Sequence, residues 1–522
     1  MPHTDIVRQS LIEPSSQNMS LITDETANKD YSPVLDFYSS RSVFVTGFSG
    51  FLGKVLVEKL LRNVDVKHIY VLMRGKRGIS PQDRIQAILS TPPFTLHDKT
   101  LLNSYKVIPV EGDLSLPDLG IDPIMKKVLC REVSVVFHSA ADVRFDADIS
   151  SNLTNNVKGT DQLLNLCQCM ENLVSLVHVS TAYSFCDRKH IEEKVHEMNF
   201  SYEDVQKVLS CGDKKLIDKQ CAKFLEGRPN SYTLTKAMSE RLVSRKHGNI
   251  STAIVRPAII TPSMRDPITG WVDTVQGFQG ITLAAQIGLL QTVDWNFWAK
   301  VDLIPVDYCA NFAIVAGWYT AKKRSNELVV YNLTLGSFHS DCTWGKLFTE
   351  GRNAAIRYPS TKQLRPLMNP PQYKRARWTY PIERFIYHTF FALIIDLILS
   401  LLGYNAFMSR QAKKLNKGLD LVEFFTTHEF EVDAQNYAEA IGALSKKDYE
   451  LFLCDPKKID MQGYATTIVQ GFRRFFLKED DKDLPKARKQ VIVVCLLYRL
   501  VQLFFLWMIG KGFLSLVTLM IK

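Results

Sequence analysis

The stretch SVFVTGFSGFLGKVLVEKLL, residues 42–61, decides the fold of this chain. An apolar run, Val43–Val45, is followed by three glycines spaced three apart, Gly47, Gly50 and Gly53, and then by an apolar stripe at helical spacing. This order predicts a buried strand, a glycine turn and a helix that packs back on the strand. Gly47 permits the tight turn, Gly50 lets a ligand approach the backbone, and Gly53 lets the helix pack closely on the sheet.

The turn between this strand and helix has the features of a dinucleotide phosphate site. The helix N-terminus presents free N–H groups and a positive dipole end to the phosphates. We expect cofactor contacts from the turn residues Thr46, Gly47, Ser49, Gly50, Phe51, Leu52 and Gly53. The spacing is G-x-x-G-x-x-G rather than the dehydrogenase G-x-G-x-x-G, so an ordinary glycine-rich turn is the alternative interpretation.

The second expected strand, HIYVLMRGKRG at residues 68–78, bears on which dinucleotide binds. NAD-selective sites have an acidic residue near the end of this strand, where it binds the ribose 2′-hydroxyl. Arg74 occupies that place here, and Lys76 and Arg77 follow it. Because cations without a carboxylate suit a 2′-phosphate, the sequence favours NADPH, with a basic surface loop as the alternative.

Further strands recur at intervals typical of strand–helix–strand units, at residues 106–114, 133–141 and 173–183. Strands that alternate with helices predict an α/β fold with a Rossmann-like doubly wound parallel sheet. We expect further cofactor contacts where the strands end. These are Asp113 to the adenine amine, Leu114 beside it, Ala140 in a small segment that leaves room, and Pro257, where residues 252–263 turn over the nicotinamide.

The catalytic candidates are Ser180, Thr181, Tyr232 and Lys236. Ser180 and Thr181 end the strand at 173–183, where such sheets place their ligands. Tyr232 and Lys236 are four residues apart in NSYTLTKAMSERLV, so they share one face of a helix. Tyr232 would give a proton to a carbonyl oxygen during hydride transfer, while Lys236 would lower the tyrosine pKa and hold the nicotinamide ribose. Thr181, or with less support Ser180, would hydrogen-bond the same oxygen.

The order of these motifs along the chain matters because a Tyr-x-x-x-Lys pair alone is common on helix surfaces. After the glycine turn and the Ser-Thr strand end, the pair favours catalysis over an exposed face. Asn156, in the helix near NNVKGTDQLLNLC, would tie this helix to the sheet or position a water for proton relay. An exposed helix asparagine is the equal alternative.

The composition is that of a folded protein of 522 residues, long enough for two or three domains. Lys and Arg exceed Asp and Glu by 64 − 54 = 10, which suits phosphates, membrane surfaces or nucleic acid, or else a solvated surface. The ten cysteines include one close pair, Cys167 and Cys169, without a second pair at metal spacing. We therefore expect reduced thiols and no metal. Residues 1–38 are expected to be a polar, mobile lead-in without a secretory signal.

Two long apolar runs lie in the C-terminal part. The first, residues 384–408, contains His388 and Asp396. A carboxylate costs about 2.5–3.5 kcal/mol at the centre of a bilayer, so we predict a packed or interfacial helix rather than a span.

The second run, residues 491–509, approaches the ~20 apolar residues that span a bilayer. The preceding cations Lys486, Arg488 and Lys489 suit the cytosolic side of a membrane. Arg499 would snorkel or mark a re-entrant hairpin. We predict that residues 486–522 are a hydrophobic membrane-associated tail, with a buried C-terminal helix as the alternative.

The sequence resembles the extended short-chain dehydrogenase/reductase group and, within it, the fatty acyl-CoA reductases. The similar segments are GFLGKVLVEKLLR, HSAADVRFD, VHVSTAY, YTLTKAMSE, RPAIITPS, GWVDTVQGFQG and DLIPVDY, and in the C-terminal part LDLVEFFTTHEFEVD and FLKEDDKDLPKARK. The last two resemble the helical domain peculiar to these reductases. The turn TGFSGFLG departs from the family, because Phe48 and Ser49 replace one glycine and a threonine.

The resemblance implies reduction of a long-chain fatty acyl-CoA to a primary alcohol by two NADPH through a bound aldehyde, for wax or ether lipid synthesis. It implies a reductase domain with a substrate region at 39–355 and a C-terminal helical domain at 356–485. The apolar segment 280–298 would line an acyl tunnel or form a plain core helix. The implied partners are acyl-CoA and membrane lipid, with no nucleic acid and an oligomer left open.

The implied location is the cytosolic face of a membrane, of the endoplasmic reticulum, a peroxisome or a lipid droplet. Two other functions remain open at this point. One is a membrane-bound dehydrogenase of the same fold that acts on a sterol or another lipid, although it leaves residues 360–490 unexplained. The other is a non-catalytic, NADPH-sensing membrane tether, which the intact Ser-Thr, Tyr and Lys set disfavours.

Overall fold

The structure, a computed structural model, describes residues 31–99, 103–210, 214–369 and 377–521. Most of the expected lead-in, residues 1–30, lies outside this range. The lead-in is expected to reach residue 38, but Pro33–Tyr38 form helix α1, which the Ser32 side chain caps by accepting a backbone N–H. Phe37 and Tyr38 are buried in the core, so folded structure begins earlier than the sequence suggests.

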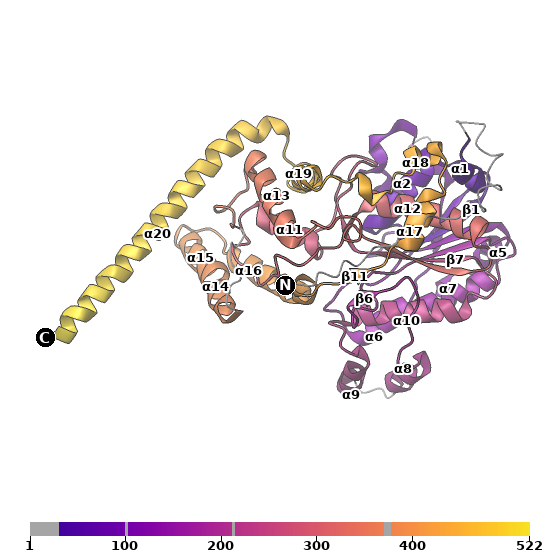
Figure 1. Cartoon of the computed structure of the whole chain (residues 1–522), viewed down its shortest axis with the longest axis horizontal. Coiled ribbons are helices and arrows are strands. Elements are labelled where there is room, and N and C mark those ends of the chain that lie inside the picture. Colours follow the sequence, from indigo (N-terminus) through magenta and orange to yellow (C-terminus); the bar gives the residue numbers. More distant parts are fainter. Residues whose placement is uncertain (1–30, 100–102, 211–213, 370–376, 522) are drawn as a thin grey trace, which may run out of the picture.

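A seven-stranded parallel sheet forms the centre of the molecule, in the order β10-β7-β5-β4-β1-β2-β3 (Figure 1). Chain order reverses between β1 and β4, which makes their carboxyl ends the usual ligand crevice of such a sheet. The predicted doubly wound fold is confirmed. The strands are β1 (Ser42–Thr46), β2 (Ile69–Met73), β3 (Val107–Glu111), β4 (Val133–His138), β5 (Ser175–Val179), β7 (Thr252–Pro257) and β10 (Leu328–Leu333).

Helices cover both faces of the sheet because successive strand residues point to opposite sides. Val43 and Val45 of β1 belong to the core on one side, and Phe44 belongs to the core on the other. The first side carries α2 (Phe51–Asn63) and α12 (Val306–Lys323), and the second carries α7 (Gly159–Gln168) and α10 (Ser231–Lys246), as Figure 1 shows. Shorter helices in the connections are α3 (Pro81–Leu89), α5 (Pro123–Glu132), α6 (Ile149–Asn152), α8 (Tyr202–Leu209) and α9 (Lys214–Cys221).

The substrate region and the C-terminal part add a second group of helices beside the sheet. A small parallel pair, β8 (Ile259–Thr261) with β9 (Leu303–Pro305), leads into it. Its helices are α11 (Phe278–Gln286), α13 (Trp344–Arg357), α14 (Tyr380–Arg384), α15 (Phe391–Leu401), α16 (Met408–Thr427), α17 (Gln435–Gly442), α18 (Lys446–Leu451) and α19 (Met461–Gly471). A π-helical turn, Phe385–Phe390, joins α14 to α15.

The C-terminal part shares a core with the sheet domain. Tyr437 of α17 packs edge-on against Phe312 of α12, with ring centroids 4.5 Å apart. Tyr464 of α19 donates a hydrogen bond of 2.9 Å to the Pro262 carbonyl. β11 (Glu431–Val432) pairs in parallel with β6 (His190–Ile191). The predicted boundary between residues 355 and 356 stays a prediction, and it would cut through these shared contacts.

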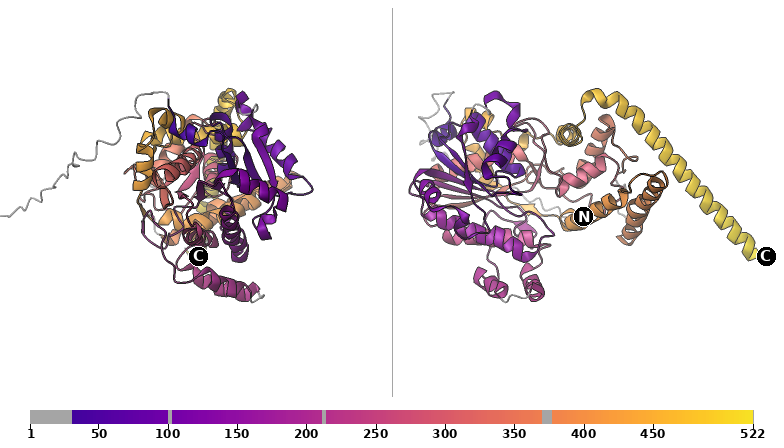
Figure 2. Two further views of the ribbon diagram at one scale, coloured as in Figure 1. Left: turned by 90° about the vertical axis from the view of Figure 1, so that its right-hand side faces the viewer. Right: turned by 180° about the vertical axis from the view of Figure 1, so that it is seen from behind.

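The last helix, α20 (Leu484–Ile521), stands apart from the body of the molecule (Figures 1 and 2). It runs unbroken through Gly510 and Gly512, so the re-entrant hairpin considered at Arg499 does not form. Most of its described apolar side chains from Ile492 onward are exposed, and Val494, Cys495 and Tyr498 are half-buried. A buried C-terminal helix is therefore also excluded. In the described residues, two helices are long and apolar enough to cross a membrane, at Tyr380–Leu401 and Asp481–Gly512.

Candidate functional site

The loop after β1 is shaped by glycines at the two places where a side chain would collide with backbone. Gly47 has φ +86°, and a Cβ there would lie 2.7 Å from the Ala140 nitrogen. A Cβ on Gly53 would lie 2.1 Å from the Gly47 carbonyl oxygen. Gly47 thus closes the turn against the end of β4, and Gly53 brings α2 onto the loop, as their spacing predicts.

The N-terminus of α2 has the geometry of an anion site. Its N-cap residue, Gly50, offers no side-chain cap to the first-turn N–H groups, and Ser49 and Gly50 are exposed. Phe51 stacks on Trp271 with ring centroids 5.3 Å apart, and Leu52 is buried, so both would offer a ligand their backbone N–H groups. The exposed, uncapped turn fits the pyrophosphate of a dinucleotide.

Thr46 joins the ends of β1 and β4 through a buried histidine. Its hydroxyl lies 2.8 Å from His138 Nδ1, and it accepts the Ala140 N–H at 3.2 Å. Burial and the nearby Lys236 charge lower the pKa of His138 to about 3, so the ring is neutral. Thr46 and Ala140 therefore lie together at the base of the loop, where both are predicted to contact the cofactor.

Arg74 and Asp113 meet at the neighbouring ends of β2 and β3. Arg74 Nη1 donates to Asp113 Oδ2 at 3.1 Å, and 62% of the Arg74 side chain is exposed. The two Ser115 hydrogen bonds and Arg74 hold the pKa of Asp113 below its usual value, against the effect of burial. Leu114 packs against Gly159, where an added Cβ would lie 2.8 Å from the leucine Cβ. The predicted adenine and 2′-phosphate residues are thus adjacent.

Tyr232 and Lys236 lie in the first half of α10, which begins because the Asn230 side chain accepts the Thr233 N–H. Lys236 is buried and donates to the Val179 carbonyl oxygen at 2.7 Å, at the end of β5. Tyr232 is partly exposed and interacts with the Thr181 side chain through a hydrogen bond. The structure therefore brings three of the four catalytic candidates to one edge of the sheet.

The pKa of Tyr232 departs from the sequence prediction. Loss of hydration raises it, and only the Thr181 hydrogen bond opposes this shift. The predicted lowering by Lys236 is wrong for this structure, because the ammonium is directed at the Val179 carbonyl. Burial lowers the pKa of Lys236 itself to about 8, against the charge of Glu240. A phenol with a raised pKa is protonated at neutral pH, which is the form that donates a proton.

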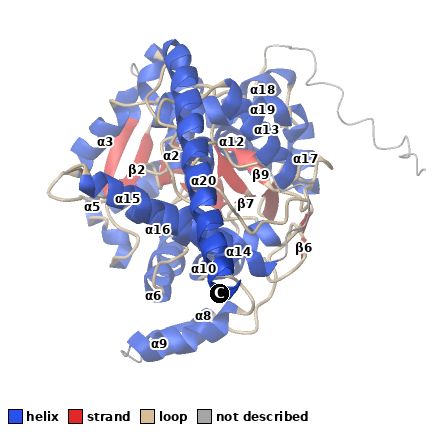
Figure 3. Ribbon diagram, turned by 90° about the vertical axis from the view of Figure 1, so that its left-hand side faces the viewer, coloured by secondary structure: helices blue, strands red, loops and turns tan. Residues whose placement is uncertain are grey.

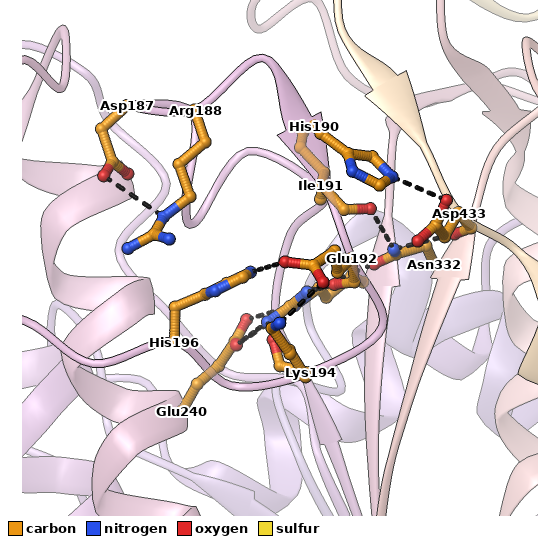
Figure 4. Close-up of polar contacts among 11 residues, drawn as sticks. Asp187, Arg188, His190, Ile191, Glu192, Lys194, His196, Glu240, Asn332 and Asp433 are labelled. Atoms are coloured by element: carbon orange, nitrogen blue, oxygen red, sulfur yellow. Dashed lines mark hydrogen bonds and ion pairs between the residues drawn. The ribbon is translucent and has the colours of Figure 1, made fainter.

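Ser180 is engaged elsewhere, which separates it from Thr181. Its hydroxyl donates to the Glu240 carboxylate, and Glu240 forms a fully buried ion pair with Arg256 at 2.6 Å. Arg256 also donates to the backbone carbonyls of Glu192 and Lys194 at 2.9 and 2.8 Å. Figure 4 shows Glu240 beside the segment that carries Glu192, Lys194 and His196. Ser180 thus belongs to a structural network below the site, and Thr181 faces Tyr232.

Asn156 and Pro257 hold the surrounding backbone. Asn156 is buried in a π-helical turn, Leu153–Lys158; its amide donates to Thr235 Oγ1 at 3.0 Å and its carbonyl accepts the Asp142 N–H at 2.7 Å. The exposed-asparagine alternative is therefore wrong, and Asn156 ties the loop after β4 to α10. π-Helical turns are frequent at functional sites. The Pro257 carbonyl accepts the Ala182 N–H at 2.9 Å, just beyond Thr181.

An aromatic wall from distant parts of the chain faces Tyr232. Phe145 lies 5.6 Å from the Tyr232 ring and 5.5 Å from Phe425 of α16, measured between centroids. The Phe425 ring also packs on Tyr183 at 4.9 Å. Sequence reasoning missed Phe425 and Glu240. The Lys236–Glu240 spacing of four residues was a usable signal for Glu240, whereas nothing local links Phe425 to the site.

An apolar pocket lies between α11, α13 and α19, and it opens to solvent on one side. Residues 280–298, predicted to line an acyl tunnel or to form core, contribute Ile281, Thr282, Ala285, Gln286, Leu290 and Trp295 to its wall. The other wall residues are Phe278, Trp344, Leu347, Phe348, Gly351, Arg352, Ala355, Leu367, Met368, Ala465, Ile468 and Val469.

Two family models, both described as male sterility protein, match this chain. The first, named for NAD binding, matches residues 45–313, and the second matches residues 387–479. Fatty acyl-CoA reductase 1 of Rattus norvegicus is 33% identical over 469 residues, 87% of this chain and 88% of the relative. Fatty acyl-CoA reductase wat of Drosophila melanogaster is 31% identical over 467 residues, 88% of this chain and 89% of the relative.

A solved structure has the same fold. The terminal R domain from the myxalamid PKS-NRPS biosynthetic pathway aligns with a TM-score of 0.57 at 20% identity, over 85% of this chain and 93% of that one. Fold and matched model together define an NAD(P)-binding Rossmann oxidoreductase. More particularly, the chain belongs to the fatty acyl-CoA reductase family, which confirms the resemblance of its motifs.

Proposed function

We propose that the protein reduces a long-chain fatty acyl-CoA to the primary fatty alcohol, with release of CoA and consumption of two NADPH. The observation that carries the proposal is the pairing of Tyr232 with Thr181 beside Lys236, at the carboxyl edge of a dinucleotide-binding sheet. Membership of the fatty acyl-CoA reductase family supports the substrate class.

The residues divide the work as follows. NADPH, when bound, supplies the hydride for each reduction. Tyr232 donates its phenolic proton to the carbonyl oxygen as that oxygen gains charge, and Thr181 hydrogen-bonds the same oxygen. The first reduction turns the thioester into a hemithioacetal, which loses the CoA thiol and leaves an aldehyde. The second reduction, at the same oxygen site, yields the alcohol.

The cofactor would lie along the loop after β1. The α2 N-terminus and the backbone of Ser49 and Gly50 would hold the pyrophosphate, and Lys236 the nicotinamide ribose. Arg74, exposed at the end of β2, would pair with the 2′-phosphate, which supports NADPH over NADH. In an Arg74→Glu variant, kcat/KM should fall with NADPH and change little with NADH. Equal use of both cofactors by the unmodified protein would contradict the assignment.

The acyl chain would occupy the apolar pocket behind α11. α16 connects this pocket to the catalytic candidates. Phe425, near its C-terminal end, packs on Phe145 beside Tyr232. Leu415, Leu419 and Val422 pack with the pocket residues Ile281 and Leu290. An aldehyde kept on this path would meet a second reduction before it escapes. The apolar α20 would keep the enzyme at the cytosolic face of a membrane, of the endoplasmic reticulum, a peroxisome or a lipid droplet.

The deciding experiment supplies purified protein with NADPH and palmitoyl-CoA or stearoyl-CoA. We expect fatty alcohol, free CoA and two NADPH oxidised per acyl-CoA, with Tyr232→Phe as the inactive control. Aldehyde as the end product, with one NADPH oxidised, would refute the two-step proposal. Oxidation or reduction of sterols without acyl-CoA turnover would indicate a different lipid dehydrogenase, and NADPH binding without any turnover would indicate a tether.

A further inference from the structure

The helix formed by α14, the π-helical turn and α15 has an apolar stripe that no other described part of the chain covers. The stripe consists of Ile382, Ile386, Phe390, Leu393, Leu397 and Leu401, and each of these side chains is exposed. Their spacing of three or four residues places them on one face of the helix. We call this set the outer stripe. Exposed apolar surfaces of this extent mark sites for a partner or a membrane.

The opposite face of the same helix is anchored to the body. His388 and Ala392 are buried, and Ala392 packs with Met408 and Ala412 of α16. Asp396 faces the start of α16, where its carboxylate accepts the N–H groups of Met408 and Ser409, both at 2.8 Å. Asp396, the residue that disfavours a span in the sequence, therefore caps the N-terminus of α16. The helix is amphipathic, and it has a fixed orientation.

The course of the chain after this helix favours a position along the bilayer surface over a crossing. After Leu401 the chain turns and returns through α16, whose far end carries Phe425 into the catalytic wall. The apolar outer stripe and the packed inner face are instead typical of a helix that lies in the plane of a membrane.

Two features at this end of the molecule point to a lipid bilayer as the occupant of the outer stripe. α20 passes beside the helix, where Tyr498 and Phe391 have ring centroids 6.2 Å apart, and Figure 3 shows α20 crossing the end that carries α15 and α16. The exposed side chains of Arg410, Lys413 and Lys414 follow on the first turns of α16. Apolar residues flanked by cations match the acyl and headgroup layers of an anionic membrane surface.

We propose that the outer stripe is a second membrane-binding surface, which lies in the lipid interface and holds the body against the bilayer that α20 enters. The surface is linked to the acyl pocket. Arg365 stacks on Phe391, with its guanidinium carbon 4.1 Å from the ring centroid, and donates to the Leu289 carbonyl at 2.7 Å, next to the pocket residue Leu290. Arg365 therefore connects the pocket wall to the helix that carries the outer stripe.

The first test uses the full-length protein in vesicles of phosphatidylcholine and phosphatidylserine. A cysteine replaces Leu397, which is 61% exposed, or the control Ile124 on α5, which is 77% exposed. The rate of alkylation by a maleimide is measured for the peptide that contains each cysteine, by mass spectrometry. Each rate is divided by the rate of the same cysteine in the denatured chain. Because the thiolate is the reacting form, a thiol in the lipid interface reacts slowly. We expect Leu397→Cys to react at least ~10-fold more slowly than Ile124→Cys.

Equal rates at the two positions would overturn the proposal. Protection that grows with the ratio of protein to lipid would assign the outer stripe to a second copy of the chain and would also overturn it.

The second test uses the protein shortened after Lys489, since no described residue of α20 beyond this point belongs to the buried core. It should still bind the same vesicles, more weakly at high salt. Leu393→Asp combined with Leu397→Asp should reduce this binding at least ~10-fold. The matched pair Tyr105→Asp with Ile124→Asp, also exposed, should not. Absence of binding by the shortened protein, or equal binding of both pairs, would contradict the proposal.

Discussion

The helix α10 and the helix α20 depart from ordinary burial in opposite directions. α10 places polar side chains inside the protein, and each of Ser239, Glu240 and Lys236 has a hydrogen-bond partner there. α20 places apolar side chains outside, over most of its length. A buried polar group needs a partner, and a long continuous run of exposed apolar side chains indicates contact with something other than water. The first departure indicates a reaction site and the second a membrane.

The largest expected effect is at Tyr232, the proposed proton donor on α10. Tyr232→Phe removes the proton donor and leaves the ring against Phe145. We expect kcat for both reductions to fall at least ~100-fold, since proton transfer by a placed side chain contributes about that much or more. NADPH affinity, measured by fluorescence titration, should stay unchanged. Turnover near that of the unmodified protein would remove Tyr232 from the mechanism.

The buried ion pair of Glu240 and Arg256 should show how much the stability of the protein depends on pairing the buried charges around α10. Glu240→Gln leaves the Arg256 charge without its counterion in the interior, where both side chains are wholly buried. Breaking such a pair costs about 3 kcal/mol or more in unfolding free energy, which urea denaturation would measure. The double variant Glu240→Leu with Arg256→Met should recover part of the loss. A change below about 1 kcal/mol in the single variant would show that the pair is solvated.

The chain-length preference should respond to a side chain that grows into the apolar pocket. Gly351 of α13 lines the pocket, and no heavy atom lies within 4 Å of a Cβ placed there. Gly351→Phe should therefore fold and fill part of the pocket. We expect kcat/KM to fall about 10-fold for stearoyl-CoA and little for a short acyl-CoA, from initial rates with each substrate. An equal fall for both lengths would place the acyl chain elsewhere, and Gly442→Phe, remote from the pocket lining, is the matched control.

The buried lysine should set an alkaline limit to activity. Burial lowers the pKa of Lys236 from 10.5 to about 8, so its ammonium is lost as pH rises through about 8. We expect kcat/KM for NADPH to fall above this pH, by about tenfold per unit. The folded state binds fewer protons than the unfolded state between these two values, so Lys236 makes stability rise with pH across that interval. A flat rate profile up to pH 10 would argue against a charged Lys236 in cofactor binding.

The fold and the placement of Tyr232 and Lys236 on one helix could be predicted because both rest on short-range patterns. The apolar run at Val43–Val45, the spaced glycines and the four-residue step in α10 are each local. The pKa of Tyr232 was wrongly predicted, since spacing places Lys236 on the correct face but does not show that it binds the Val179 carbonyl. The contribution of Phe425 depends on the return of α16 to the sheet, which no local pattern contains.

The tail gave a similar lesson, because Arg499 suggested a re-entrant hairpin and the structure has a continuous helix there. Gly510 and Gly512 cost only about 1 kcal/mol each within a helix. In lipid, a break would leave backbone groups without hydrogen bonds, which costs several kcal/mol per group. The continuous helix is thus the favoured state for a segment that enters a membrane.

The smallest expected effect on stability comes from removing the C-terminal tail. Removing residues 490–522 takes away most of α20, where most of the described apolar side chains are exposed, whereas Ala487, which is buried, remains. We expect the unfolding temperature to change by less than about 2 °C, and activity on a water-soluble acyl-CoA to persist. Attachment to membranes should change from resistant to extractable by alkaline carbonate, because only the outer stripe would remain to hold the protein. A drop of 10 °C or more would show that α20 packs into the core, and the contrast with α10 would fail.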